Sequence, residues 1–162
     1  MEEKIRIKII IADDNKIFCK ILEEYLLKFE EIEILGIAYT DEEEINMIEN
    51  LKPEIVITDL VRKHKYTGLQ IIKDYSKRKA KPEFLVISAD EKEDVIDTNL
   101  KIGGYIEKPF FDYSIIIEEL RRIKAEKIHE QNQIMTLKEI KIIVNNFWYK
   151  ILEFFKIRKQ VK

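Results

Sequence analysis

The stretch IIIADDN, residues 9–15, decides the fold class of this 162-residue chain. An unbroken run of β-branched side chains is typical of a strand that is buried on both faces, as in a parallel sheet covered by helices. Two aspartates follow this run directly. If the sheet is parallel, they lie at its carboxyl edge, where open α/β sheets bind their ligands.

Four further apolar runs of strand length alternate with segments of helical spacing. The five predicted strands are Ile5–Ala12, Ile32–Ala38, Glu54–Thr58, Phe84–Ser88 and Gly104–Ile106. This alternation predicts an α/β fold of the (βα)5 type, with a doubly wound parallel five-stranded sheet. Between the second and third strands, a helix is predicted with Asp41 as its N-cap and Glu44 at its third position.

Composition excludes several classes of protein. Hydrophobic residues make up 46% and charged residues 37% of the chain, which is too apolar for a disordered protein. No window approaches the roughly 20 uncharged apolar residues that a membrane span needs, and the first residues lack a signal-peptide cleavage site. The single cysteine, Cys19, cannot form an internal disulfide. We therefore expect a cytoplasmic protein.

Polar residues that can do chemistry follow four of the predicted strands: Asp13, Asp14, Asp59, Ser88 and Lys108. Three carboxylates at one edge repel each other unless a cation is present, and hard oxygen ligands suit Mg²⁺. A lysine, a hydroxyl and a divalent metal around one carboxylate would stabilise a phosphoryl group that is transferred to it.

Four motifs carry a resemblance to a known family: IIIADDN (9–15), IVITDL (55–60), FLVISAD (84–90) and GGYIEKPF (103–110). In this order and spacing, the chain resembles the receiver domain of two-component response regulators, the CheY-like family with a flavodoxin-like fold. The resemblance covers roughly residues 5–125. It implies a receiver domain at 1–131 and leaves 132–162 as an amphipathic helical extension.

The resemblance implies a role for each acidic residue. Asp59 would be the phosphoacceptor, and the cofactor would be Mg²⁺ or Mn²⁺. Asp14 would bind the metal directly and Asp13 largely through water. Asp59 itself and the backbone carbonyl of Val61 would complete the protein's ligands.

The resemblance also implies a switch. Lys108 would pair with Asp59 or its phosphoryl oxygen, and the bond before Pro109 would be cis. Ser88 would move toward the phosphoryl group and draw Tyr105 inward. The partner would be a histidine kinase or a phosphotransfer protein, and the chain would be a signalling switch of a phosphorelay rather than a turnover enzyme.

The loop after Asp59 departs from the family pattern. It has no proline, and Gly68 comes nine residues after Asp59, one more than is usual in the family. Arg62, Lys63 and Lys65 make this loop basic. We expect a solvated cationic loop, with attraction of phosphodonors as the alternative.

The C-terminal part is basic and helical. Residues 1–119 have 18 Lys and Arg against 27 Asp and Glu, whereas residues 120–162 have 11 against 4. A helix is predicted from about Asp112 to about Gln131, followed by a break at 131–133. The sequence Thr136-Leu137-Lys138-Glu139 reads as the capping box of a second helix. About 30 residues follow Gln133, which is few for a compact helix-turn-helix domain.

An apolar seam of heptad spacing runs through the second predicted helix: Leu137, Ile140, Val144, Phe147, Ile151, Phe154 and Val161. Further apolar residues widen this face: Ile143, Trp148, Leu152 and Phe155. A homodimer through residues 136–161 is the first interpretation, and docking on a partner or on the receiver domain is the second. A membrane surface is a third, because basic residues follow the seam. Nucleic acid is a weak fourth, since no base-reading motif accompanies them.

Two other functions compete with the switch. A phosphohydrolase with an aspartyl nucleophile commonly has a second acid two residues later, where this chain has Val61 after Asp59. A phosphorylation-independent scaffold, or a membrane-surface adaptor on a receiver fold, would use the C-terminal helix and leave Asp59 without a role.

Overall fold

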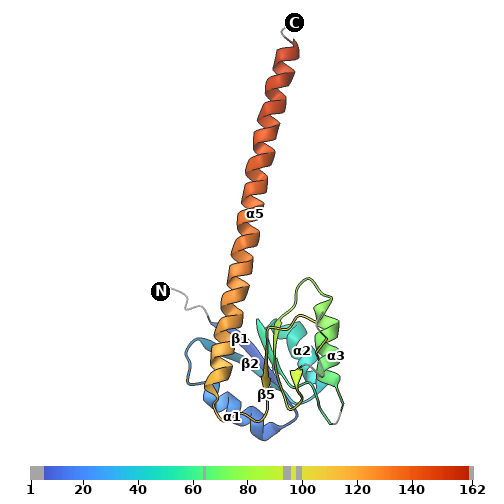
Figure 1. Ribbon diagram of the computed structural model, residues 1–162, viewed down its shortest axis with the longest axis vertical. Coiled ribbons are helices and arrows are strands. Elements are labelled where there is room, and N and C mark those ends of the chain that lie inside the picture. Colours follow the sequence, from blue (N-terminus) through green and yellow to red (C-terminus); the bar gives the residue numbers. More distant parts are fainter. Residues whose placement is uncertain (1–5, 64, 93–95, 98–99, 161–162) are drawn as a thin grey trace. The chain divides into compact units, whose positions relative to one another are not determined.

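The computed structural model describes residues 6–63, 65–92, 96–97 and 100–160, with the side chains of the last helix described as far as Trp148. Five strands form one sheet in the order β2-β1-β3-β4-β5, and every neighbouring pair is parallel (Figure 1). The strands are β1 (Ile7–Ala12), β2 (Ile32–Ala38), β3 (Ile55–Thr58), β4 (Glu83–Ser88) and β5 (Gly104–Glu107). The predicted fold class is confirmed, and the observed strand ends lie within about two residues of the predicted ones.

Among the described residues, four helices accompany the sheet: α1 (Lys16–Leu26), α2 (Asp41–Leu51), α3 (Thr67–Ser76) and α5 (Ser114–Gln160). One core packs α1 and the first turns of α5 on one sheet face, with Ile9, Leu22 and Ile116 fully buried. A second core packs α2 and α3 on the other face. A helix between β4 and β5 is part of the predicted pattern, but residues 93–95 and 98–99 lie outside those that the structure describes.

The start of α2 differs from the prediction by one residue. Thr40 is the N-cap, with extended backbone angles (φ −137°, ψ 159°), and its hydroxyl accepts a hydrogen bond from the Glu43 backbone N–H at 3.2 Å. The Glu43 carboxylate accepts one from the Tyr39 N–H at 2.7 Å. The prediction of Asp41 as N-cap was wrong because the adjacent threonine supplies the capping oxygen. Asp41 and Glu44 are thereby left for contacts elsewhere.

The predicted break at residues 131–133 was also wrong, because α5 is continuous from Ser114 to Gln160. The Thr136 hydroxyl does not cap a helix: it donates to the Asn132 carbonyl at 3.0 Å within the helix. The physical reason is that neither glycine nor proline occurs between 114 and 160. Polar residues alone do not end a helix whose backbone bonds are intact.

The chain divides into two compact units, residues 1–123 and 124–162. Among the residues that the structure describes, no helix combines the length and the apolar character needed to cross a membrane. The first unit holds the sheet and all the polar strand ends singled out above.

Candidate functional site

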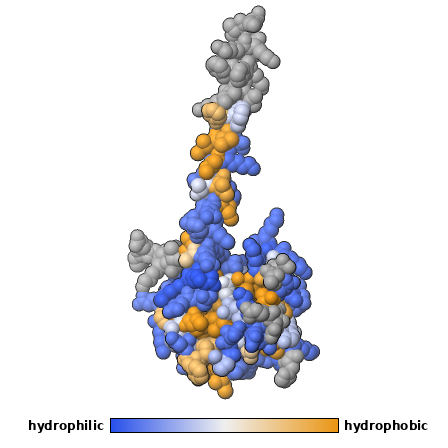
Figure 2. Space-filling view, viewed as in Figure 1, coloured by the Kyte–Doolittle hydropathy of each residue, from blue (hydrophilic) through white to orange (hydrophobic). Residues whose placement is uncertain are grey.

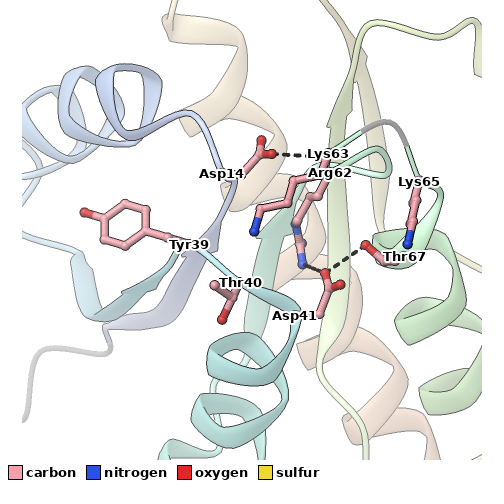
Figure 3. Close-up of a pocket in the computed structure, with 8 residues that line it drawn as sticks. All are labelled: Asp14, Tyr39, Thr40, Asp41, Arg62, Lys63, Lys65 and Thr67. Atoms are coloured by element: carbon pink, nitrogen blue, oxygen red, sulfur yellow. Dashed lines mark hydrogen bonds and ion pairs between the residues drawn. The ribbon is translucent and has the colours of Figure 1, made fainter.

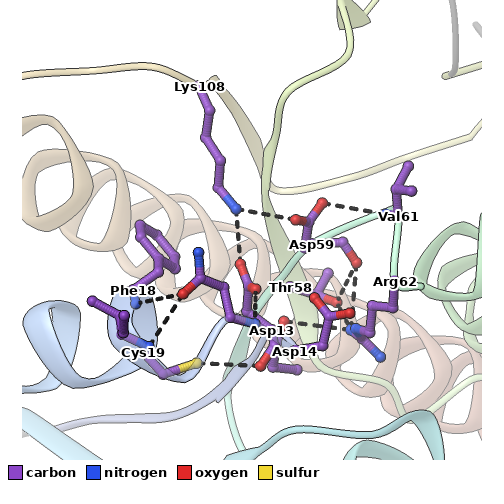
Figure 4. Close-up of polar contacts among 12 residues, drawn as sticks. Asp13, Asp14, Phe18, Cys19, Thr58, Asp59, Val61, Arg62 and Lys108 are labelled. Atoms are coloured by element: carbon purple, nitrogen blue, oxygen red, sulfur yellow. Dashed lines mark hydrogen bonds and ion pairs between the residues drawn. The ribbon is translucent and has the colours of Figure 1, made fainter. Parts of the chain in front are cut away.

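Acidic residues from two strands and one lysine from a third meet at the carboxyl edge of the sheet (Figure 4). Asp13 and Asp14 follow β1, Asp59 follows β3, and Lys108 follows β5. The Lys108 Nζ lies 2.8 Å from Asp13 Oδ2 and 3.0 Å from Asp59 Oδ2. Lys108 therefore bridges two of the predicted carboxylates.

Burial strengthens the charge interactions among these side chains. The side chain of Asp13 is 3% exposed, that of Asp59 13% and that of Lys108 22%. Burial alone would lower the pKa of Lys108, but the hydrogen bonds and charges of Asp13 and Asp59 outweigh it and raise the pKa. Lys108 is therefore an ammonium at neutral pH. Its single positive charge lies among three carboxylates at this edge, those of Asp13, Asp14 and Asp59.

Backbone N–H groups orient each carboxylate. Asp13 Oδ1 accepts from the Asn15 N–H at 2.8 Å, and the Asn15 side chain in turn caps α1. Asp59 Oδ1 accepts from the Val61 N–H at 3.2 Å, and Asp14 Oδ2 accepts from the Lys63 N–H at 3.0 Å. The loop after β3 therefore holds both an acid of its own and one that follows β1.

That loop turns back on itself. Arg62 and Lys65 exchange backbone hydrogen bonds of 2.9 Å each, and Lys63 between them has a left-handed backbone (φ 47°). Lys63 and Lys65 are exposed, as expected of a solvated cationic loop. Arg62 is only 4% exposed, so the prediction was wrong for this residue.

Arg62 is buried because α2 supplies its counterions. Its guanidinium lies 2.6 Å from Glu44 Oε2 and 2.7 Å from Asp41 Oδ1. Burial raises the pKa of Glu44, and Arg62 opposes that rise. The sequence analysis did not identify Asp41 and Glu44 as counterions of a buried arginine. One signal was present, because Glu44 precedes the buried Ile48 by one helical turn and so shares its inward face.

The two residues of the predicted switch lie on neighbouring strands. Ser88 is 1% exposed, and its Oγ makes no hydrogen bond of normal geometry to a described residue. The Tyr105 hydroxyl donates to the Asp90 carbonyl at 2.8 Å. Burial raises the pKa of Tyr105 to about 12, and the nearby Ser88 hydroxyl opposes the rise. The Lys108–Pro109 peptide bond is cis, as the resemblance implied.

A pocket of about 220 Å³ opens beside Asp14, between the loop after β2 and the loop after β3 (Figure 3). It is lined by Asp14, Tyr39, Thr40, Asp41, Arg62, Lys63, Lys65 and Thr67. Its walls thus include the outer side of the acidic cluster and both exposed lysines of the loop. Water and small ions can reach Asp14 through this space.

The donor chemistry of the site suits Mg²⁺ bound largely by water. Within the described part of the chain, no three His, Cys, Asp or Glu side chains are close enough to hold a metal by themselves. Mg²⁺ needs only one or two protein carboxylates and keeps several waters. The carboxylates that this edge offers to such an ion are those of Asp14, on the pocket wall, and Asp59, beside Val61.

A sequence model described as the response regulator receiver domain matches residues 9–121. The chain belongs to this family. Solved receiver domains share its fold. The response regulatory domain of the protein mrkE from Klebsiella pneumoniae is 22% identical with a TM-score of 0.64, covering 74% of this chain and 96% of that one.

Two further solved structures are of regulators that bind DNA. RcsB from Salmonella enterica serovar Typhimurium, bound to promoter rprA in the presence of the phosphomimetic BeF3⁻, is 21% identical (TM-score 0.61; 74% of this chain and 99% of that one). A DNA-binding response regulator of the LuxR family from Staphylococcus aureus is 16% identical (TM-score 0.64; 72% and 97%). At this identity the likeness establishes the receiver fold.

Proposed function

We propose that this receiver domain accepts a phosphoryl group on Asp59. The observation that supports it best is the Lys108 ammonium, which bridges Asp59 and Asp13 at 3.0 and 2.8 Å while Asp59 stays partly exposed. A carboxylate oxygen of Asp59 attacks phosphorus and forms the new O–P bond. The bond from phosphorus to the donor breaks, and the leaving group departs with that electron pair.

The residues around Asp59 divide the work of this transfer. The Val61 N–H holds Asp59 Oδ1, and Lys108 faces Oδ2, where it is placed to neutralise the transferred phosphoryl oxygens. Asp14, Asp13 through water, Asp59 and the Val61 carbonyl would hold Mg²⁺. The metal, when bound, supplies charge neutralisation for the phosphoryl group.

Ser88 and Tyr105 are the residues through which we propose that phosphorylation is read. The Ser88 hydroxyl is buried beside Tyr105 and makes no hydrogen bond of normal geometry to a described residue. A phosphoryl oxygen on Asp59 would offer it an acceptor. Moving Ser88 toward that acceptor would leave room for the Tyr105 ring, at the loss of the bond from Tyr105 to the Asp90 carbonyl.

The donor would be a histidine kinase or a phosphotransfer protein in the cytoplasm, and the output would be protein–protein contact rather than catalytic turnover. The solved RcsB contacts a promoter. In this chain the described residues after Ile123 form one helix with wide apolar exposure. That surface favours a protein partner over nucleic acid.

Intact mass after incubation with acetyl phosphate and Mg²⁺ tests the acceptor. The parent chain should gain one phosphoryl group, and Asp59→Asn should gain none. If the folded parent gains nothing, the phosphoacceptor function is wrong and the scaffold interpretation takes its place. A scaffold would also keep its partners and its oligomeric state in Asp59→Asn.

We further propose that α5 self-associates. Its seam residues Leu137, Ile140, Val144 and Phe147 are 66%, 51%, 45% and 61% exposed, and hydrophobic side chains gather along this part of the helix (Figure 2). The seam residues Ile151, Phe154 and Val161 lie outside the side chains that the structure describes. An uncovered apolar surface of this kind is unfavourable in water.

Sedimentation equilibrium tests this association. The parent should be a dimer or a small bundle, and Ile140→Lys should shift it toward monomer by at least tenfold in dissociation constant. Asn146→Lys adds the same charge off the seam and should leave the mass distribution unchanged. A monomeric parent at about 100 μM, a concentration at which weak association would show, would contradict self-association.

A further inference from the structure

The Arg62 guanidinium lies inside the protein, beneath the carboxyl edge of the sheet (Figure 4). Its Nη2 donates to Thr58 Oγ1 at 2.6 Å and lies 3.4 Å from the carbonyl oxygens of Ala12 and Asp59. Those three residues are the ends of β1 and β3 and the proposed phosphoacceptor itself. One side chain therefore contacts both strands that carry the acidic cluster.

Helix α2 holds this guanidinium from the other side. Glu44 is fully buried and lies 2.6 Å from Nη2, and Asp41 lies 2.7 Å from Nη1. Asp41 also accepts a hydrogen bond from the Thr67 hydroxyl at 2.9 Å, at the start of α3. Arg62, Glu44, Asp41 and Thr58 make up what we term the Arg62 network.

Glu44 and Asp41 compensate the charge of Arg62 through its two Nη atoms, whereas Arg62 Nε and Glu44 Oε1 are buried and make no hydrogen bond to a described residue. Burial would lower the pKa of Arg62, but Glu44 and Asp41 outweigh it and raise the pKa. Two carboxylates for one guanidinium leave no surplus positive charge for a phosphodonor. A buried ion pair of this kind adds little net stability compared with apolar residues, and specifying the local geometry is one role that such pairs have in proteins.

The geometry in question is that of the loop after Asp59. With Arg62 fixed, its backbone bonds to Lys65 close the tight turn, and the turn presents the Lys63 N–H to Asp14 at 3.0 Å. One residue before Arg62, the Val61 N–H meets Asp59 at 3.2 Å. Both contacts depend on where the backbone at 61–63 lies, and Arg62 is the buried side chain in its middle.

We propose that Arg62 is a positioning residue, whose network with α2 sets the backbone of residues 61–63 against Asp59 and Asp14. Its effect on phosphorylation rests on the proposed function of Asp59, whereas its effect on the loop backbone does not. Arg62 acts through Val61 and Lys63 and does not itself contact the reacting atoms.

The test compares three variants with the parent. Arg62→Met removes the guanidinium but strands the buried Glu44, so the double variant Arg62→Met with Glu44→Met is made beside it to keep the interior neutral. Arg78→Met is the matched control, because Arg78 pairs with Glu49 of the same helix α2 at an exposed site.

Amide hydrogen exchange is the first readout. In the folded double variant, the amides of Val61, Lys63 and Lys65 should exchange at least tenfold faster than in the parent. In Arg78→Met they should keep the parent rates within about twofold, because the loss of one hydrogen bond would change the rates by more than that. Unchanged exchange in a folded double variant overturns the positioning role.

Phosphorylation by acetyl phosphate over a range of Mg²⁺ concentrations is the second readout. The double variant should react at least tenfold more slowly and require more Mg²⁺ for its half-maximal rate, while Arg78→Met reacts as the parent does. A purely structural role would lower stability and leave the Mg²⁺ requirement of the folded protein unchanged. That result would also overturn the proposal.

The two readouts separate this inference from the proposed function. A parent that takes no phosphoryl group contradicts the function of Asp59, and hydrogen exchange then decides on Arg62 alone. A parent that is phosphorylated and a double variant with faster loop exchange but parental rate and Mg²⁺ requirement would show that the loop backbone does not govern the reaction, and so would refute the positioning role.

Discussion

Replacing Gly68 with alanine should damage both stability and phosphorylation, because no room exists for a Cβ at this position. A Cβ built there would lie 2.0 Å from the carbonyl oxygen of Asp59 and 3.1 Å from the Leu60 Cα, and all of its nearest neighbours are backbone atoms. Real Cβ contacts essentially never fall below 3.0 Å. Helix α3 and the Asp59 backbone must therefore separate by about 1 Å.

The size of both effects follows from that displacement. Overpacking of a tight site typically costs about 1–3 kcal/mol, and better helix propensity of alanine returns up to about 1 kcal/mol. We expect Gly68→Ala to lower the free energy of unfolding by about 2 kcal/mol by urea titration. Since a shift of about 1 Å at a reacting group can cost roughly 100-fold in rate, phosphorylation of Asp59 should slow by about that factor.

Gly36→Ala is the matched control. Its Cβ would lie 2.9 Å from the Met47 Sδ, the far end of a flexible side chain that can move aside. We expect a loss below about 1 kcal/mol and an unchanged phosphorylation rate. Equal stability losses in the two variants, or a parental rate in a folded Gly68→Ala, would refute the argument that the acceptor backbone leaves no space at Gly68.

The remaining predictions concern Cys19 and Lys108. Cys19 is fully buried, and burial together with the nearby Asp13 raises its pKa to about 11. At pH 8 only about one thiol in 1,000 is therefore a thiolate. Iodoacetamide should label Cys19 at least 100-fold faster in urea than in the folded protein. Lys108→Met should lower the free energy of unfolding by about 3 kcal/mol without Mg²⁺, since it strands the buried Asp13; added Mg²⁺ should restore part of the loss in thermal melts. Because the folded-state pKa of Lys108 is raised above 10.5, its stabilisation is fully present below that value and is lost as pH rises through the folded pKa. Lys108 should therefore add no pH dependence to the parent's free energy of unfolding between about pH 6 and 9, and its contribution should fall only as pH rises above 10.5.

Sequence predicted the sheet and the acidic edge because both depend on simple patterns. Runs such as Ile9–Ile11 are buried on both faces, and parallel strands bring their carboxyl ends to one edge. That rule was enough to place Lys108 beside Asp13, although 95 residues separate them in the chain. The bridging contact itself, one ammonium to two carboxylates, needed the structure.

Arg62 shows where such patterns fail. In a basic loop an arginine is most simply solvated, and nothing beside it in the sequence indicates burial. Its counterions Asp41 and Glu44 come from the start of α2, on the far side of β3 in the sequence. Their availability depended on a further detail, that Thr40 rather than Asp41 caps the helix. A shift of one residue in a cap thus decided whether a buried cation has partners.

The two cations near the acidic cluster have different charge balances, and this difference assigns their roles. Lys108 is bound by carboxylates of the site itself, so its partners would change if Asp59 accepts a phosphoryl group as we propose. Arg62 has Glu44 and Asp41 of α2 as counterions, and these lie outside the reaction. A phosphoryl group on Asp59 would therefore interact with Lys108, while Arg62 keeps its contacts to the carbonyls of Ala12 and Asp59. The electrostatic response to phosphorylation should thus fall on β5 and its neighbour β4, which carry Lys108, Tyr105 and Ser88, and the edge formed by β1 and β3 should stay in place.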